Sequence, residues 1–305
     1  MSFLAKAGKG ALDLFLGLVA LCLYIAMAFV AYYGMKLAGL DDEVYDGLYS
    51  FAAAVLTIIC FLIYNRFSSS EKKKRLIKTR RITAFEVVLL VVIGLGLVGF
   101  VTSYLSVFIL LSDYFAPVQQ EVSNYEESMD RYAEVAKEVI PLWDSCLYAF
   151  TMAFLIPLSE EMVFRGAIYG HVERAFKPWA AIIITALTFG AMHGLTIHIG
   201  YAVICGIIIT SCYYYTGSIV SSIILHSLFN LLGSSLPFVL LLDELAIPED
   251  IANNIYSVVN YATLLAMIPA VFAFISLIRY NQKRMKAEAK ALEETLVTEA
   301  AVADE

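Results

Sequence analysis

The sequence predicts an all-α fold, a polytopic membrane bundle of about eight transmembrane helices with both termini in the cytosol. Of the 305 residues, 60% are hydrophobic and only 16% are charged, whereas a soluble domain is nearer half apolar and a quarter charged. The apolar residues form blocks of about 20, long enough for a helix to cross the hydrocarbon core of a bilayer. Charged residues gather between these blocks, with basic and acidic segments in turn.

Each apolar block is an expected span. The first follows Lys6 and Lys9 and is too long for the core of a signal peptide, so we expect it to be retained. Pro157 is expected to break the fourth block near its end, and Gly233 and Pro237 to kink the seventh. In chain order the blocks cover residues 12–36, 47–64, 85–111, 143–163, 178–195, 197–215, 218–242 and 255–279.

The charges between the blocks predict the orientation. Three basic segments follow the second, fourth and eighth blocks, at residues 66–81, 165–177 and 279–286. The intervening segments are acidic, at residues 41–43, 121–138 and 243–250. Because Lys and Arg favour the cytoplasmic side, this alternation places both termini in the cytosol. The net charge of −7 reflects the acidic loops and tail. Nucleic acid is not expected as a partner, because there is no basic surface to neutralise phosphates.

The same pattern divides the chain into four regions. Residues 1–112 are N-terminal transmembrane helices, and residues 113–142 are an extracytoplasmic acidic loop that can form a short amphipathic helix. Residues 143–280 are the membrane core that carries the candidate site, and residues 281–305 are a charged cytoplasmic tail. We expect this tail to be a frayed helix with a disordered tip, because it is polar and has no helix stop signal.

A few ionisable side chains fall within the expected spans, where each costs at least a few kcal/mol and is a functional candidate by default. Glu161 and Arg165 are four residues apart and can pair on one helix face. Glu160 lies about 100° further round the helix, without such a partner, and is left as the candidate base. The other ionisable candidates are His193 and His226.

Together these residue types suit hydrolysis of an amide by water. A buried carboxylate beside His193 can orient and deprotonate water. His226 and Asn230 are four residues apart, and two adjacent donors suit a developing oxyanion. Ser159 has no histidine at helical spacing and is a poor nucleophile. The other two histidines are given no catalytic role: we expect a solvated His171 in a cytoplasmic connection and a structural His198 at the outer interface.

Three motifs carry a family resemblance: EExxxR at residues 160–165, FxxxH at 189–193 and HxxxN at 226–230. In this order they resemble the CAAX prenyl protease type II and bacteriocin-processing family, the glutamic intramembrane proteases known as CPBP or Abi. The resemblance covers about residues 143–242. It implies a membrane endopeptidase with a cavity open to the cytosol and no metal or other cofactor. It implies that Glu160 and His193 activate water, and that His226 and Asn230 form the oxyanion hole, with Glu161, Arg165 and Phe189 in support.

Members of that family differ in function, so alternatives stay open. The partners expected are the lipid bilayer and a peptide or protein substrate, for which a prenylated C-terminus, a leader peptide and a transmembrane regulator all stay open. The expected location is a bacterial cytoplasmic membrane. Two carboxylates and two histidines could instead ligate zinc, although the helical HExxH pairing is absent. The same cluster could also serve a non-catalytic binding or immunity protein, or a proton-relay transporter, although no inverted repeat is visible.

Overall fold

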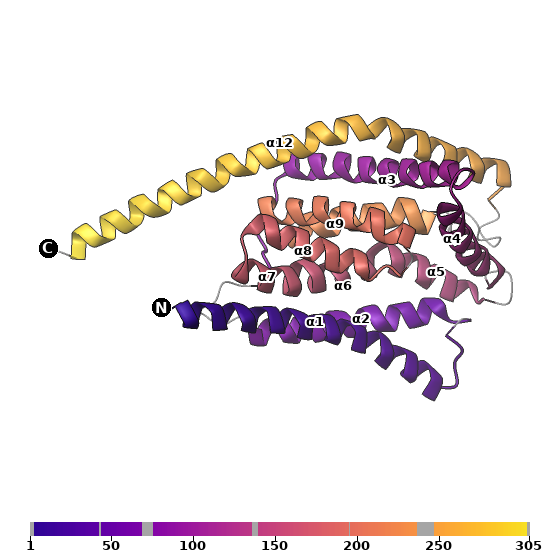
Figure 1. Cartoon of the computed structure of the whole chain (residues 1–305), viewed down its shortest axis with the longest axis horizontal. Helices are drawn as coiled ribbons and strands as arrows, with labels where there is room; N and C mark the ends of the chain where they lie inside the picture. The colour runs from indigo at the N-terminus through magenta and orange to yellow at the C-terminus, as the bar shows by residue number, and fades with distance from the viewer. Residues whose placement is uncertain are drawn as a thin grey trace.

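The computed structural model describes residues 3–42, 44–68, 76–135, 140–194, 196–236 and 247–303. Throughout these residues the chain forms helices joined by short turns, with no strand, which confirms the all-α prediction. Most helices lie roughly parallel in a layered bundle, and the two chain termini lie at the same end of it (Figure 1). This placement agrees with the even number of crossings expected from the sequence.

The helices occupy the expected blocks. Within the described residues, six helical segments are long and apolar enough to cross a membrane, and the shorter apolar segments Pro178–Ala191 and Ile219–Ser235 correspond to the fifth and seventh blocks. The protein is therefore a multi-pass membrane protein. Outside the fourth and seventh blocks the bounds are α1 Phe3–Leu37, α2 Asp46–Ser68, α3 Ala84–Ser112, α4 Ala116–Val135, α8 Pro178–Ala191, α9 Thr196–Thr216 and α12 Glu249–Ala303.

The fourth block is longer than predicted and is not broken. It runs without interruption from Leu142 to Ala175, wound as α5 Leu142–Phe150, η1 Thr151–Leu155, α6 Ile156–Glu161, η2 Met162–Ile168 and α7 Tyr169–Ala175, of which η1 and η2 are π-helical. Pro157 lies in the first turn of α6, directly after η1. There the wider π turn and the helix start tolerate the missing N–H, so the proline is accommodated and the helix continues.

The prediction for His171 was wrong because of this longer helix. Its side chain lies on α7 and is fully buried, not solvated. Nδ1 of His171 lies 3.1 Å from Oδ1 of Asp13 on α1, and Nε2 lies 2.9 Å from the hydroxyl of Tyr64 on α2. The extra turns of helix place this histidine inside the bundle, where it joins α7 to α1 and α2.

The remaining segments are also helical. The seventh block forms α10 Ile219–Asn230 followed by the π-helical η3 Leu231–Ser235, which contains Gly233, while Pro237 lies outside the described residues. Helix α4 confirms the helix expected in the acidic loop. The tail is a regular continuation of α12 as far as Ala303, where a frayed helix was expected, and it extends beyond the bundle (Figure 1).

Close helix contacts are made at glycines, as is common between membrane helices. A Cβ atom added at Gly99 of α3 would lie 2.2 Å from the carbonyl oxygen of Thr263 on α12. One at Gly47 of α2 would lie 2.1 Å from the carbonyl oxygen of Asp144. The carboxylate of Asp144 also accepts the N–H groups of Gly47 and Leu48, both at 2.8 Å, and so satisfies two unpaired donors at the start of α2.

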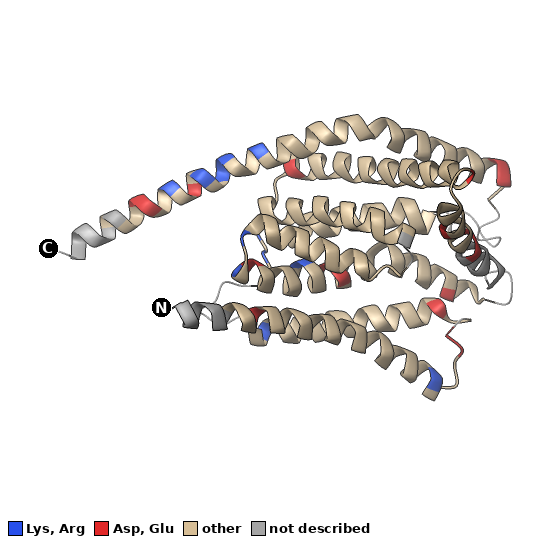
Figure 2. Ribbon diagram, in the orientation of Figure 1, with Lys and Arg blue, Asp and Glu red and all other residues tan. Residues whose placement is uncertain are grey.

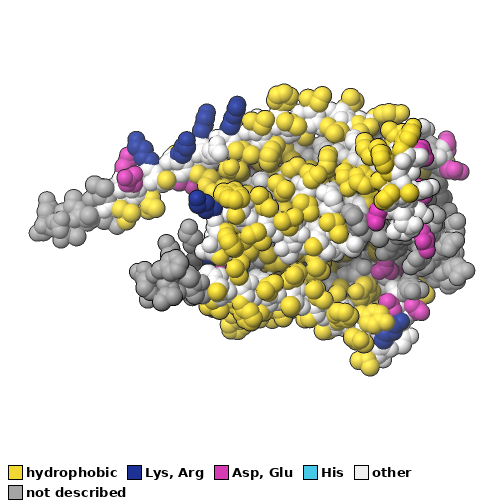
Figure 3. All heavy atoms as spheres, in the orientation of Figure 1, with side chains coloured by type: hydrophobic (Ala, Val, Ile, Leu, Met, Phe, Trp, Pro, Cys, Tyr) yellow, Lys and Arg dark blue, Asp and Glu magenta, His cyan; other side chains and the backbone are white. Residues whose placement is uncertain are grey.

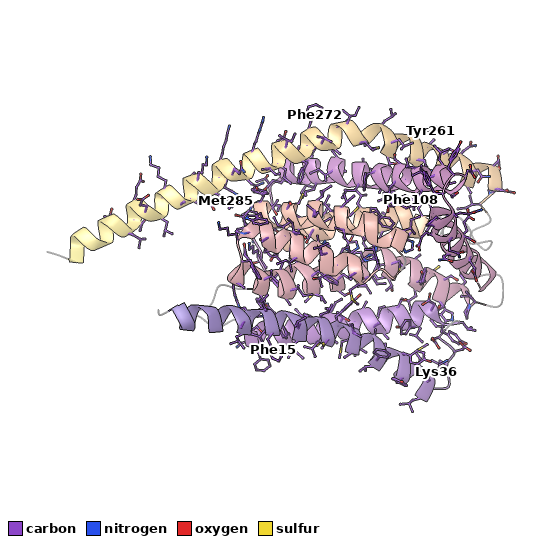
Figure 4. The ribbon with its side chains drawn as sticks, viewed as in Figure 1. Phe15, Lys36, Phe108, Tyr261, Phe272 and Met285 are labelled. Atoms are coloured by element: carbon purple, nitrogen blue, oxygen red, sulfur yellow. The ribbon has the colours of Figure 1, made fainter. Side chains whose placement is uncertain are left out.

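The outer surface is suited to lipid. Apolar side chains cover the middle of the visible face, and charged ones lie toward its two ends (Figure 3). Phe15 of α1 and Phe272 of α12 point outward from the bundle (Figure 4), and they are 61% and 66% exposed. In the ribbon most acidic residues of the loops lie at the end opposite the termini (Figure 2). Since hydrocarbon solvates apolar side chains, exposure of this kind is expected across the bilayer.

Candidate active site

His226 of α10 lies between the two neighbouring glutamates of α6. Its Nδ1 is 2.8 Å from Oε1 of Glu161, and its Nε2 is 3.8 Å from Oε2 of Glu160. The second distance is too long for a hydrogen bond. The two carboxylates thus approach opposite nitrogens of one imidazole, although they start about 100° apart on the helix. The structure brings together Glu160, Glu161 and His226 from two motifs.

The ion pair predicted from the spacing of Glu161 and Arg165 is present and fully buried. Nη1 of Arg165 donates to Oε1 of Glu161 at 2.7 Å, and neither side chain is exposed. The guanidinium also lies over the ring of Phe189, 4.5 Å from its centroid, which offers a cation–π contact. A buried ion pair needs such further partners to offset the loss of hydration. Glu161 therefore has a structural explanation that Glu160 lacks.

Phe189 of α8 joins the aromatic and basic groups of the site. Its ring makes edge contacts with Phe164, His193 and His226, at centroid distances of 5.1, 4.6 and 5.7 Å. Nδ1 of His193 lies 2.9 Å from the carbonyl oxygen of Phe189. A carbonyl can only accept, so this nitrogen carries the proton and Nε2 of neutral His193 keeps its lone pair. His193 is partly exposed, and no hydrogen bond or ion pair between the described residues joins it to Glu160.

Asn230 has a different partner from His226. Its Nδ2 donates to the carbonyl oxygen of Met152, in the π-helical segment η1, at 2.9 Å. The residues share one face of α10 and both are buried, but their hydrogen bonds lead to different parts of the fourth helix. The side-by-side oxyanion role inferred from their spacing stays a prediction.

The comparisons with known proteins match this same part of the chain. Residues 142–232 match the model of a family described as type II CAAX prenyl endopeptidase Rce1-like. These residues, 142–232, are called the Rce1-like core below, after the family whose model they match. This core contains every residue of the three motifs, from Glu160 to Asn230.

A curated relative agrees over a similar length. The UPF0177 protein YxdF of Lactococcus lactis subsp. lactis (strain IL1403) is 32% identical over 87 residues, which is 28% of this chain and 48% of the relative. The match thus spans about half of the relative. No solved structure matches the chain at a significant level. The first three helices and α12 lie outside the Rce1-like core.

One residue that reaches the site from outside the Rce1-like core was not predicted from the sequence. The hydroxyl of Tyr24, on α1, donates to Oε1 of Glu160 at 3.0 Å. A polar hydroxyl in the middle of the first apolar block was the available signal. The signal is weak, because the sequence of α1 does not say which helix α1 packs against.

A cavity of about 450 Å³ lies between α1, α2 and α7, and no predicted site residue lines it. A cavity that opens from Glu160 to the cytosol therefore stays a prediction. The lining residues of the cavity are Leu16, Leu23, Cys60, Ile63, Tyr64, Phe67, Ser68, His171 and Arg174.

Within the described residues no group of three or more His, Cys, Asp or Glu side chains is arranged to hold a metal ion. Metal independence nevertheless stays a prediction.

Proposed function

We propose that this protein is an intramembrane glutamic endopeptidase, in which Glu160 is the base that activates water for hydrolysis of a peptide bond. One observation carries the proposal. The Oε2 atom of Glu160 faces Nε2 of His226 at 3.8 Å, across a gap that no direct hydrogen bond closes. At this separation a single water beside the gap can hydrogen-bond to both the carboxylate and the imidazole. The match to the Rce1-like family supports the same reaction class.

In the proposed reaction Glu160 takes a proton from water as the water oxygen forms a bond to the peptide carbonyl carbon. Nε2 of His193 orients this water by accepting its second hydrogen. The negative charge that develops on the carbonyl oxygen is stabilised by N–H groups of His226 and Asn230. Glu160 then returns the proton to the peptide nitrogen as the C–N bond breaks, so that no covalent enzyme intermediate forms.

The buried ion pair supports the role given to His226. Because Oε1 of Glu161 accepts a hydrogen bond, the Nδ1 that lies 2.8 Å away carries a proton. The same oxygen is held by Arg165. The imidazole is therefore fixed with Nε2 toward Glu160. When both ring nitrogens carry a proton, the Nε2–H can donate to an oxyanion. This orientation is the kind of support that a preorganised site requires.

The finer features belong to the same proposal. The reaction needs no metal or other cofactor, the site opens to the cytosol, and the protein resides in a bacterial cytoplasmic membrane. The substrate is a peptide or protein with a prenylated C-terminus or a leader peptide. The Rce1-like core supports the prenylated class.

The test compares cells that produce the wild-type protein, Glu160→Gln or Glu288→Gln. Glu288 is an exposed glutamate of the tail, so its substitution controls for the loss of one carboxylate. We expect proteomics of new N- and C-termini to find a cleavage product in wild-type and Glu288→Gln cells that is absent with Glu160→Gln, at equal protein levels. Identical termini in all three strains would contradict the proposal and favour a non-catalytic binding protein or a proton relay.

A further inference from the structure

We infer that Tyr24 is a positioning residue for Glu160, so that α1 completes the active site of the Rce1-like core. The inference rests on the proposed function, because it gives Glu160 the role of base. It adds a residue from a helix that neither the motifs nor the family match includes. Tyr24 is separated from Glu160 by 136 positions in the chain, and its hydroxyl donates to Oε1 of Glu160 at 3.0 Å.

The two oxygens of Glu160 have different surroundings. Oε1 accepts the hydrogen bond from Tyr24, while Oε2 faces Nε2 of His226 at 3.8 Å. A glutamate has three side-chain torsions, and the terminal one is broad. With Oε1 held, rotation about that torsion is restricted and Oε2 keeps its direction toward the gap. The Tyr24 hydroxyl therefore selects which oxygen is presented to water.

Tyr24 is itself held in place by packing. Its ring makes an edge contact with Phe164, at 5.8 Å between centroids. Phe164 in turn contacts Phe189, the aromatic ring that touches both His193 and His226. A donor supported by packed aromatic rings positions its acceptor more precisely than one at the end of a mobile side chain.

Helix α1 is also fixed at a second point. Oδ1 of Asp13 lies 3.1 Å from Nδ1 of His171 and 3.5 Å from Nη1 of Arg174, both on α7. Asp13 and Tyr24 are eleven residues apart, or about 16 Å along a helix that rises 1.5 Å per residue. Two polar contacts at this spacing prevent α1 from sliding along the fourth helix. The register that brings Tyr24 to Glu160 is therefore set by residues outside the motifs.

Tyr64, which is half-buried, shows that a tyrosine hydroxyl can be satisfied away from the site, and it also lies 2.9 Å from Nε2 of His171. It donates to the backbone carbonyl oxygen of Leu16 on α1, at 3.1 Å. Tyr24 instead donates to the carboxylate proposed as the base. A contact to the reacting carboxylate predicts an effect on turnover, whereas a contact to a backbone carbonyl predicts an effect on folding alone.

The experiment replaces Tyr24 by Phe, which keeps the ring against Phe164 and removes the hydroxyl. Tyr32→Phe, on the same helix, is the matched control, since the Tyr32 ring contacts Tyr33 and Lys36 and not the site. The substrate is the cellular protein whose cleavage depends on Glu160. We expect Tyr24→Phe to lower kcat about tenfold to a hundredfold, with KM and thermal unfolding unchanged, and Tyr32→Phe to match wild type.

Glu160→Gln in the same assay distinguishes failure of the proposed function from failure of the role given to Tyr24. If Glu160→Gln cleaves as wild type does, the proposed function fails. If Glu160→Gln is inactive while Tyr24→Phe keeps the wild-type kcat, or loses activity only in proportion to folded protein, the inference about Tyr24 is overturned. We further expect the double variant to be no less active than Glu160→Gln alone, because Tyr24 acts through Glu160.

Infrared spectroscopy gives a readout that needs no substrate. The carboxylate band of Glu160 is identified as the band missing from Glu160→Gln. Loss of a hydrogen-bond donor changes the stretching frequency of a carboxylate, so we expect this band to shift in Tyr24→Phe and to stay in place in Tyr32→Phe. An unshifted band in Tyr24→Phe would overturn the inference whatever the activity.

Discussion

Oε1 of Glu161 accepts two hydrogen bonds, from Nη1 of Arg165 at 2.7 Å and from Nδ1 of His226 at 2.8 Å. A single buried oxygen therefore joins an ion pair within the fourth helix to the histidine of α10. Glu160, one residue earlier, is joined to α1 through Tyr24. Glu161 therefore holds the histidine, and Glu160 is the carboxylate that we propose as the base.

The Glu161–Arg165 pair is expected to be important for stability. Glu161→Gln leaves the buried guanidinium without a counter-charge, and breaking a buried pair costs about 3–5 kcal/mol. We expect a clear loss of stability to unfolding in detergent. The double variant Glu161→Gln with Arg165→Met is expected to be less destabilised than the sum of the two single variants, because it leaves no unpaired buried charge. Strict additivity would contradict this account.

His193 and His198 form a matched pair for a test of the water-orienting role. His198 packs between Tyr125 and Tyr201, with ring centroids at 5.3 and 5.6 Å, and belongs to no motif. We expect His193→Ala to lower the cleavage rate about a hundredfold or more, as for loss of a general acid–base group. The side chain of His198 hydrogen-bonds the backbone of His193, so we expect His198→Ala to lower the rate much less than His193→Ala. Rates are measured by appearance of the new terminus, and equal rates for both variants would remove His193 from the site.

Gly99 is expected to control the packing of α3 on α12. A Cβ atom there would lie 2.2 Å from the carbonyl oxygen of Thr263, a backbone atom that cannot simply rotate away. We expect Gly99→Ala to cost about 1–3 kcal/mol, as for overpacked positions. Gly34→Ala on α1 is the control, because nothing lies within 4 Å of its added Cβ atom. Thermal unfolding of both variants in detergent decides the matter, and equal melting temperatures would refute the prediction.

Asp144 is expected to stabilise the start of α2, since its carboxylate accepts from the N–H groups of Gly47 and Leu48. Loss of a side chain that caps a helix costs about 0.5–2 kcal/mol. We expect Asp144→Ala to speed hydrogen exchange in the first turn of α2. Asp113→Ala, which removes an exposed aspartate after α3, should leave that turn unchanged. The prediction fails if exchange is the same in both.

A chelator separates the glutamic mechanism from the zinc alternative. The proposed reaction uses Glu160 and His193 to activate water, so we expect cleavage to continue after treatment with 1,10-phenanthroline. Metal content of the purified protein is measured in parallel. A stoichiometric metal whose removal abolishes cleavage would favour the zinc site, because catalytic zinc is held by the same residue types.

The sequence by itself determined which segments form the apolar helices. Bilayer thickness fixes the length of an apolar helix, so composition alone located the spans. The helical repeat is also local, and it predicted that Arg165 would pair with Glu161. The order of the three motifs pointed to the residues that the Rce1-like family match later covered.

Only the tertiary structure decided which helices supply partners to the glutamates. Glu160 meets Tyr24 and His226 across long separations in the chain, and His171 is buried by Asp13 and Tyr64, not solvated. These contacts depend on how the helices pack together, and helix packing leaves no repeating pattern in the local sequence. In lipid each helix satisfies its own backbone, so hydropathy locates every span while leaving open which side chains meet between them.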